Sequence, residues 1–309
     1  MIIYIIKRIL LIFPVLIGIT LFIFLILALA PGDPVTMIMG SEVSMEEIAA
    51  RRSEMGLDQN VFLRYIKYMT SVVQGDFGRS WLNARPVMLE FWQRFPNTLA
   101  LALSSLSLTI VIGLSFGTIA AVWQNRPIDG ITLLFALLFA SMPTFWFGLM
   151  MQLFFALKLR WFPALGVGTI KHMVLPAVAL SLATIANQIR MTRSSILDVI
   201  NMDYVRTARS KGAGEFRVIF RHVIRNALMP VVTNWGLTFA VAFGGTIVTE
   251  TIFSIPGIAT YLINAVKGRD VPVVMGTIII VAIIVAIINL IIDLIYAFID
   301  PRVKLGYIS

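Results

Sequence analysis

Six long apolar stretches, separated by polar segments, dominate the amino-acid sequence. A helix needs about 20 apolar residues to cross a bilayer, and most of these stretches reach or exceed that length. The predicted spans are residues 9–30, 97–122, 131–157, 173–189, 230–249 and 273–299. The fourth is the shortest and most polar, so its ends are the least sharply defined. The pattern predicts an all-α integral membrane protein with six transmembrane helices.

The composition supports a membrane protein. Hydrophobic residues make up 59% of the 309 residues and charged residues 13%, against roughly 45–50% and 25% in soluble proteins. The chain has no cysteine, which excludes disulfides, iron–sulfur clusters and thiol catalysis. Its two histidines, His172 and His222, fall on opposite sides of the predicted membrane. A histidine-based metal site is therefore not expected.

The first apolar stretch is expected to be retained as a transmembrane helix covering residues 1–30. Lys7 and Arg8 precede it and Ala28-Leu29-Ala30 end it, which is also a pattern of cleaved signal peptides. However, the apolar run is longer than the roughly 7–15 residues of a signal peptide. Pro31 would also follow the cut directly and hinder the protease.

The net charge of +9 comes from 25 Lys and Arg against 16 Asp and Glu. The basic excess is strongest in the short loops on the side of the N-terminus, which by the positive-inside rule is the cytoplasm. This predicts that both termini are cytoplasmic. The positive charge therefore reflects the orientation of the chain in the lipid membrane, and no nucleic-acid partner is expected.

Residues 31–96 are predicted to form a small external subdomain. Ser44 and Glu47 have the spacing of a capping box that opens a helix, and Gly56 suits its end. A second helix is expected over residues 61–73, followed by a turn at 75–78. The subdomain either caps the outer ends of the spans or docks an extracellular partner, and the residues alone favour neither. The external segment 253–272 is likewise either a lid over the outer mouth or a simple connector.

The cytoplasmic loop 190–229 is predicted to contain two short helices. The first covers residues 203–211, with Asp203 as its N-cap and Gly212 after its end. A helix this short is unstable alone in water, so it must dock on another surface. In the second, residues 215–229, Arg217, Arg221 and Arg225 share one face. The opposite face is apolar and is expected to lie along the membrane boundary; it comprises Phe216, Ile219, Phe220, Val223, Ile224 and Ala227. Alternatively, the whole loop is an interfacial segment that serves only topology.

Several polar residues fall inside or at the ends of the predicted spans. A charge at mid-membrane costs about 2.5–3.5 kcal/mol on insertion scales, so such residues normally face protein or water. The candidates for a pathway or gate are Asn187, Gln188, Asn234, Glu250 and Asp293. The alternative for the three amides is hydrogen bonding between helices, and for Asp293 it is an ion pair with a cytoplasmic arginine. Glu250 lies at the outer edge of the fifth span, where a gate would be expected.

Sequence motifs for catalysis are missing. The chain contains no Gly-Lys dipeptide, hence no phosphate-binding loop, and no H-E-x-x-H zinc motif. No enzymatic activity of its own is therefore expected. Energy for transport must come from a partner or from an ion gradient.

Five segments resemble one known family. They are residues 30–34, 74–80, 203–212, 221–230 and 253–257, which read APGDP, QGDFGRS, DYVRTARSKG, RHVIRNALMP and FSIPG. Along nearly its whole length the chain resembles the B-type permease subunit of bacterial dipeptide, oligopeptide and nickel ABC importers. The resemblance implies the type I importer permease fold, with a five-helix core over residues 97–309.

The resemblance also implies roles and partners. The coupling contacts to an ATPase subunit would come from Asp203, Tyr204, Arg206, Thr207, Ala208, Arg209, Lys211 and Gly212. Arg206 occupies the position where the general loop motif has glutamate, so a glutamate contact is not implied. The partners would be a second, homologous permease, two P-loop ATPase subunits that hold ATP and Mg, and a substrate-binding protein that meets residues 31–96. No cofactor would bind this chain itself.

The expected function is import of short peptides, including glutathione-like ones, across the cytoplasmic membrane by alternating access. Nickel or a metal chelate is the alternative substrate. An ion-coupled secondary transporter is the rival class, but it would need charges deep in several spans, and here only Asp293 lies well inside one. A membrane enzyme is disfavoured by the missing catalytic motifs.

Overall fold

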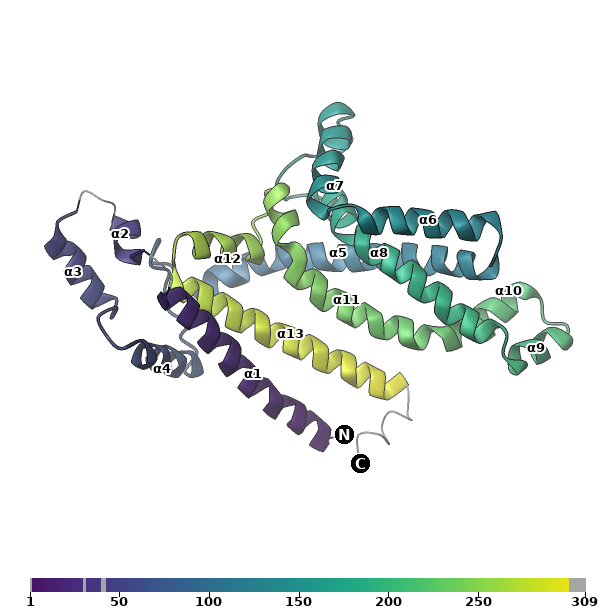
Figure 1. Cartoon of the computed structure of the whole chain (residues 1–309), viewed down its shortest axis with the longest axis horizontal. Coiled ribbons are helices and arrows are strands. Elements are labelled where there is room, and N and C mark those ends of the chain that lie inside the picture. The colour runs from purple at the N-terminus through teal and green to yellow at the C-terminus, as the bar shows by residue number, and fades with distance from the viewer. Residues whose placement is uncertain (1, 30–31, 40–42, 300–309) are drawn as a thin grey trace. The chain divides into compact units, whose positions relative to one another are not determined.

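The computed structural model describes residues 2–29, 32–39 and 43–299, and nearly all of them are helical (Figure 1). The elements, with η for a π-helical segment, are α1 (Ile2–Leu29), α2 (Pro34–Met39), α3 (Met45–Glu54), α4 (Val61–Val73), α5 (Val87–Val122), α6 (Pro127–Ser141), α7 (Thr144–Met151), η1 (Gln152–Lys158), α8 (Ile170–Ile200), α9 (Asp203–Ser210), α10 (Glu215–Arg217), η2 (Val218–Ile224), α11 (Arg225–Ile252), α12 (Ile258–Lys267) and α13 (Val271–Ile299). Within these described ranges, one isolated antiparallel bridge, between Arg79 and Pro86, is the only β-type pairing. The predicted all-α class is confirmed.

Five helices of the described chain are long and apolar enough to cross a membrane, and a bent pair brings the number to six. The third predicted span, 131–157, corresponds to this bent pair, in which α6 and the α7–η1 helix meet at 99°. Pro143 explains the break. It has no N–H to donate, and it holds the preceding Met142 in an extended conformation with ψ of 127°.

The fourth span is longer than predicted. α8 begins at Ile170 and continues to Ile200, whereas the apolar pattern ended at residue 189. Arg190 and Arg193 interrupt the pattern without interrupting the helix, because charged side chains are tolerated where a helix leaves the bilayer or meets a partner.

The chain divides into two compact units: Met1–Pro96 with Gly257–Leu290, and Asn97–Pro256 with Ile291–Ser309. In the first unit, Asp270 ties the turn after α4 to the start of α13. Its carboxylate accepts a hydrogen bond from the Ser80 hydroxyl and another, of 3.1 Å, from the Trp81 amide. Asp270 is fully buried, so this turn is fixed by tertiary contacts as well as by its own geometry.

The predicted local structure of the first unit is confirmed in detail. The Ser44 side chain accepts from the Glu47 amide, and the Glu47 carboxylate accepts from the Ser44 amide. Gly56 follows the end of α3 with φ of +66°, a conformation that favours glycine. α4 covers the predicted residues 61–73.

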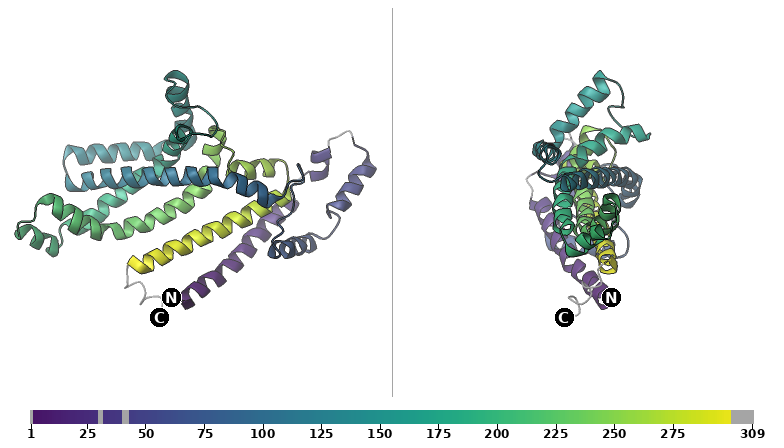
Figure 2. Two further views of the ribbon diagram at one scale, coloured as in Figure 1. Left: turned by 180° about the vertical axis from the view of Figure 1, so that it is seen from behind. Right: turned by 90° about the vertical axis from the view of Figure 1, so that its right-hand side faces the viewer.

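In the second unit, α8 is the central helix and packs against α6, α7 and α11 (Figure 2). One apolar cluster joins Leu101, Leu175, Ala179 and Phe253 near the start of α8. A second cluster lies at the other end of α8, where α9 is attached. α8 thus connects two separately packed ends of the unit.

Candidate functional site

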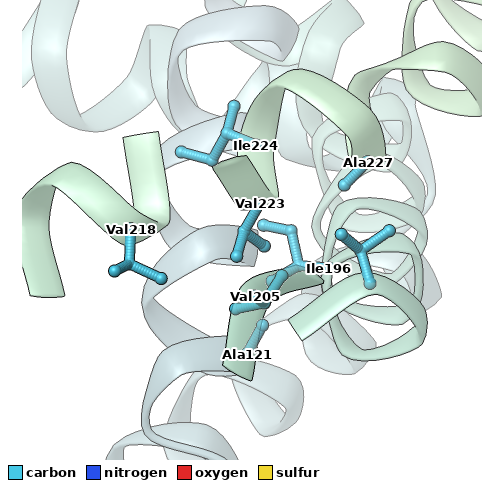
Figure 3. Close-up of a cluster of buried hydrophobic side chains, with 8 residues drawn as sticks. Ala121, Ile196, Val205, Val218, Val223, Ile224 and Ala227 are labelled. Carbon is cyan, nitrogen blue, oxygen red and sulfur yellow. The ribbon is translucent and has the colours of Figure 1, made fainter. Parts of the chain in front are cut away.

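α9 is attached to the second unit by one buried side chain. Val205 has no exposed surface and lies in a cluster to which four neighbouring elements contribute (Figure 3). The other members are Ala121 of α5, Ile196 and Val199 of α8, Val218, Val223 and Ile224 of η2, and Ala227 of α11. Fully burying a valine contributes about 1.5–3 kcal/mol. This contact supplies the tertiary support that an eight-residue helix lacks alone.

The predicted coupling residues surround this anchor. Asp203, Tyr204, Arg206, Thr207, Lys211 and Gly212 are exposed, whereas Ala208 and Arg209 are half-buried. Ala208 packs against the apolar cluster. Arg209 Nε donates a 2.8 Å hydrogen bond to Glu215 Oε1 across the turn. One side of α9 is therefore fixed to the unit, and the opposite, polar side is presented to the surroundings.

The two ends of α9 differ in how well they were predicted. The prediction of Asp203 as N-cap is wrong, because Met202 occupies the N-cap position, without a capping hydrogen bond from its side chain, and Asp203 is the first residue of the helix. The Asp203 carboxylate still lies in the first turn, where it interacts favourably with the helix dipole. Gly212 follows the helix with φ of +80°, as expected for a glycine that ends it.

The second predicted loop helix is not a separate element. α10, η2 and α11 follow one another without a break, and together they form one apolar segment, Glu215–Ile252. The predicted shared apolar face is also divided: Val223, Ile224 and Ala227 are buried in the α9 cluster, whereas Phe216 and Phe220 are exposed. The π-helical turn of η2 explains the difference, because hydrogen bonds from i to i+5 rotate the side chains out of the α-helical register.

The amide residues at mid-span are partly joined. Asn234 Nδ2 of α11 donates a 3.0 Å hydrogen bond to Gln188 Oε1 of α8. Gln188 Nε2 donates to Thr192 Oγ1 one turn further along α8, and Gln188 is fully buried. Asn187 points elsewhere and is exposed. Gln188 and Asn234 thus link α8 to α11, whereas the Asn187 side chain lies on the exposed surface of α8.

Glu250 and Asp293 do not meet these amides. Glu250 is fully buried, and the Thr98 hydroxyl of α5 donates a 2.6 Å hydrogen bond to its Oε1. Asp293 lies in α13, but its side chain is outside the described residues. Among the residues that the structure describes, no three acidic or histidine side chains are grouped so that they could hold a metal ion.

Two family models match the chain. Residues 113–305 match the binding-protein-dependent transport system inner membrane component, and residues 1–102 match the N-terminal part of the corresponding membrane component. The chain belongs to this permease family. It is a multi-pass inner-membrane permease of an ABC importer, as its motifs and apolar helices led us to expect.

Individual relatives agree with the family. The permease is 38% identical over 301 residues to the glutathione transport system permease protein GsiC of Salmonella paratyphi A. The matched region covers 97% of this chain and 98% of GsiC. The same values hold for GsiC of Escherichia coli K12. The inward-facing MetNI methionine ABC transporter matches with a TM-score of 0.59 and 18% identity, over 69% of this chain and 97% of that chain. The last comparison shows the type I importer permease fold.

The sequence interpretation missed an ion pair within the permease. Arg193 Nε and Nη2 of α8 donate to the two carboxylate oxygens of Asp129 of α6, each at 2.7 Å. Asp129 is buried. No sequence spacing indicates such a pair, because the partners lie on different helices.

A second missed feature is the close approach of α5 to α8. A Cβ on Gly113 would lie 2.3 Å from Gln188 Cγ, and one on Gly117 would lie 2.8 Å from the backbone oxygen of Ile189. Only glycine fits at these two positions. The spacing is the G-x-x-x-G pattern of closely packed membrane helices, which would have signalled this contact in the sequence.

Proposed function

We propose that α9 is the coupling helix of this permease and that an ATPase subunit binds its exposed face. ATP and Mg would be held by two such partner subunits, and the permease itself would bind no cofactor. A second, homologous permease would complete the pathway. The permease core would comprise residues 97–309, and the termini would be cytoplasmic, as the charges of the short loops favour.

The attachment of Val205 is the observation that carries this proposal. One fully buried side chain connects α9 to α5, α8 and α11 through a continuous apolar cluster. The exposed coupling residues, including Tyr204 and Arg206, lie on the surface that faces away from that cluster. A partner that moves α9 would therefore move the ends of three membrane helices.

Transport would follow as alternating access. Closure of the ATPase dimer on ATP would displace α9 together with the attached ends of α8 and α11. The pathway would then open toward the external side and receive substrate from a binding protein at residues 31–96. Hydrolysis of ATP would return α9 and the attached helix ends to their starting positions. The candidates for residues along the pathway or its gate remain Asn187, Gln188, Asn234, Glu250 and Asp293.

The proposed substrates are short peptides, including glutathione-like ones. The support is the similarity to the glutathione transport system permease GsiC, which extends over nearly the whole chain. Such substrates are polar, so the pathway must offer hydrogen-bonding groups, as the exposed amide of Asn187 does.

Two substitutions in and beside α9 test the coupling. Ala208→Glu would place a carboxylate against the apolar cluster, and Gly212→Pro would impose a φ near −65° where the chain has +80°. Both variants should insert into the membrane but lose ATP-dependent peptide uptake in proteoliposomes. Lys171→Glu, at the far end of α8, is the matched control and should retain uptake. Normal uptake by both α9 variants would contradict the proposal.

A further inference from the structure

α4 lies beside α1, not beyond its end. The hydroxyl groups of Tyr65 on α4 and Thr20 on α1 are 2.9 Å apart, and the Tyr65 hydroxyl also donates to the Ile17 carbonyl at 3.3 Å. Thr20 is about 14 Å along α1 from Leu29, at a rise of 1.5 Å per residue. Leu10–Leu29 is the apolar span of α1, so the Tyr65 hydroxyl reaches the depth of the hydrocarbon core, whose half-thickness is about 15 Å.

Two further contacts confirm this depth within the first unit. The ring centroids of Phe24 and Tyr65 are 5.5 Å apart, and both side chains pack with Met275 of α13 in one buried cluster. Phe24 lies about 8 Å from the end of α1, and Met275 about 6 Å from the start of α13. The contacts of α4 therefore lie about one to two and a half helical turns inside the ends of two spans.

The face of α4 that these spans leave uncovered is apolar. Phe62, Ile66 and Val73 are 59%, 57% and 85% exposed, and with half-buried Met69 they follow a helical stripe next to the buried Tyr65 face. Lys67 and Thr70 lie beyond this stripe and are exposed. α4 is therefore apolar over a wider arc than its protein neighbours cover.

We propose that lipid of the leaflet on the side of residues 32–96 covers this stripe, so that α4 is an interfacial membrane helix. Such a helix buries its apolar face about 5–10 Å below the headgroups and keeps its polar face in water. This matches the depth of the Phe24 and Met275 contacts, and the Tyr65 hydroxyl, at the tip of its side chain, reaches deeper. Lys67, whose ammonium donates a 2.7 Å hydrogen bond to Gln59 Oε1, would then lie on the water-facing side.

The neighbouring surface of α1 favours lipid over a protein partner. Ile17, whose carbonyl receives the Tyr65 hydrogen bond, is itself 51% exposed in an apolar span. The α4 stripe continues this apolar surface. A water-soluble binding protein would have to reach below the end of α1 to cover it. The proposal leaves α2, α3 and the 75–86 turn for such a partner.

The absence of cysteine in the chain permits a direct test by single spin labels. Ile66→Cys, Val73→Cys and Lys67→Cys would be labelled in the full-length permease, assembled with its partners in nanodiscs. Phe22→Cys on α1 is the lipid-facing control and Met45→Cys on α3 the water-facing control; both side chains are exposed. The measured quantity is the accessibility of each label to oxygen, which partitions into lipid, and to a water-soluble nickel chelate.

Labels at residues 66 and 73 should behave like that at 22, with an oxygen-to-nickel ratio several-fold above those at 67 and 45. A label at 66 as accessible to nickel as that at 45 would show an aqueous surface and overturn the proposal. Shielding of residue 66 from both reagents would show that a second subunit covers the stripe, which also overturns it. Val73 lies at the end of α4, so its label reports even if the Ile66 variant folds poorly.

Discussion

Asp129 and Arg193 join the beginning of α6 to α8 through a two-pronged ion pair, with both N–O distances at 2.7 Å. Arg193 lies one turn before Ile196, which belongs to the cluster that holds α9. The pair therefore adds α6 to the helices that are fixed to the coupling region. Displacement of α9 would then act on the bent α6–α7 span as well as on α8 and α11.

Loss of this pair should destabilise the permease. Asp129→Ala leaves the Arg193 guanidinium without its carboxylate, and breaking a buried pair costs roughly 3–5 kcal/mol. Since the Arg193 side chain is 21% exposed, we expect the low end of that range. Thermal unfolding in detergent measures it, with Arg190→Ala, an exposed arginine of the same helix, as control. Equal melting temperatures for the two variants would refute a stabilising role for the pair.

The glycines that face α8 should not tolerate a methyl group. Gly117→Ala would force α5 away from the Ile189 carbonyl and Thr192, at a cost of about 1–3 kcal/mol. Gly130→Ala in α6 is the matched control, because no atom lies within 4 Å of its added Cβ. That variant should gain about 0.5–1 kcal/mol of helix stability. The account fails if Gly117→Ala melts at or above the wild-type temperature.

Asn234, which is hydrogen-bonded between helices, and Asn187, which is exposed, should respond differently to substitution by alanine. Asn234→Ala removes the hydrogen bond to Gln188 and should lower stability by about 0.6 kcal/mol, the mean for such bonds between membrane helices. Asn187→Ala should leave the melting temperature unchanged and raise the KM for peptide uptake, if its exposed amide lines the pathway. An unaltered KM in Asn187→Ala would remove that residue from the pathway candidates.

Tyr261 of α12 should make the first unit sensitive to alkaline pH. Burial, followed by the negative charges of Glu90 and Asp270, raises the pKa of Tyr261 to about 12 from 10.0. The folded state thus favours the neutral phenol, so this contribution to stability is complete below pH 10 and is lost as the pH rises from 10 to 12. Tyr261→Phe should show a smaller fall in melting temperature over that interval. Parallel curves for variant and wild type would contradict the assignment.

Much of the fold could be predicted from the sequence because its causes are local. Apolar length identifies the spans, and the Ser44–Glu47 capping box and the positive φ of Gly212 follow from residue type and spacing. The bend at Pro143 was foreseeable as a break, but its angle of 99° depends on what α7 packs against.

The candidate site depended more on contacts between distant residues. Val205 was placed in the correct helix, but its role as anchor required Ala121 and Ile196, which are brought together only by folding. The pairs Asp129–Arg193 and Glu250–Thr98 each join separate helices, and no periodicity encodes their meeting. Helix register also failed at η2, where a π-helical turn redirects Phe216 and Phe220 away from the predicted shared face.

The central claim is that an ATPase subunit binds the exposed face of α9. It is tested most directly with Arg206→Cys, an exposed position in a chain without other cysteines, carrying a photo-activated cross-linker in the assembled transporter. We predict that illumination joins the permease to the ATPase subunit and that uptake falls in proportion to the joined fraction. A cross-linker that reacts only with lipid, in a transporter that still imports peptide, would contradict the account.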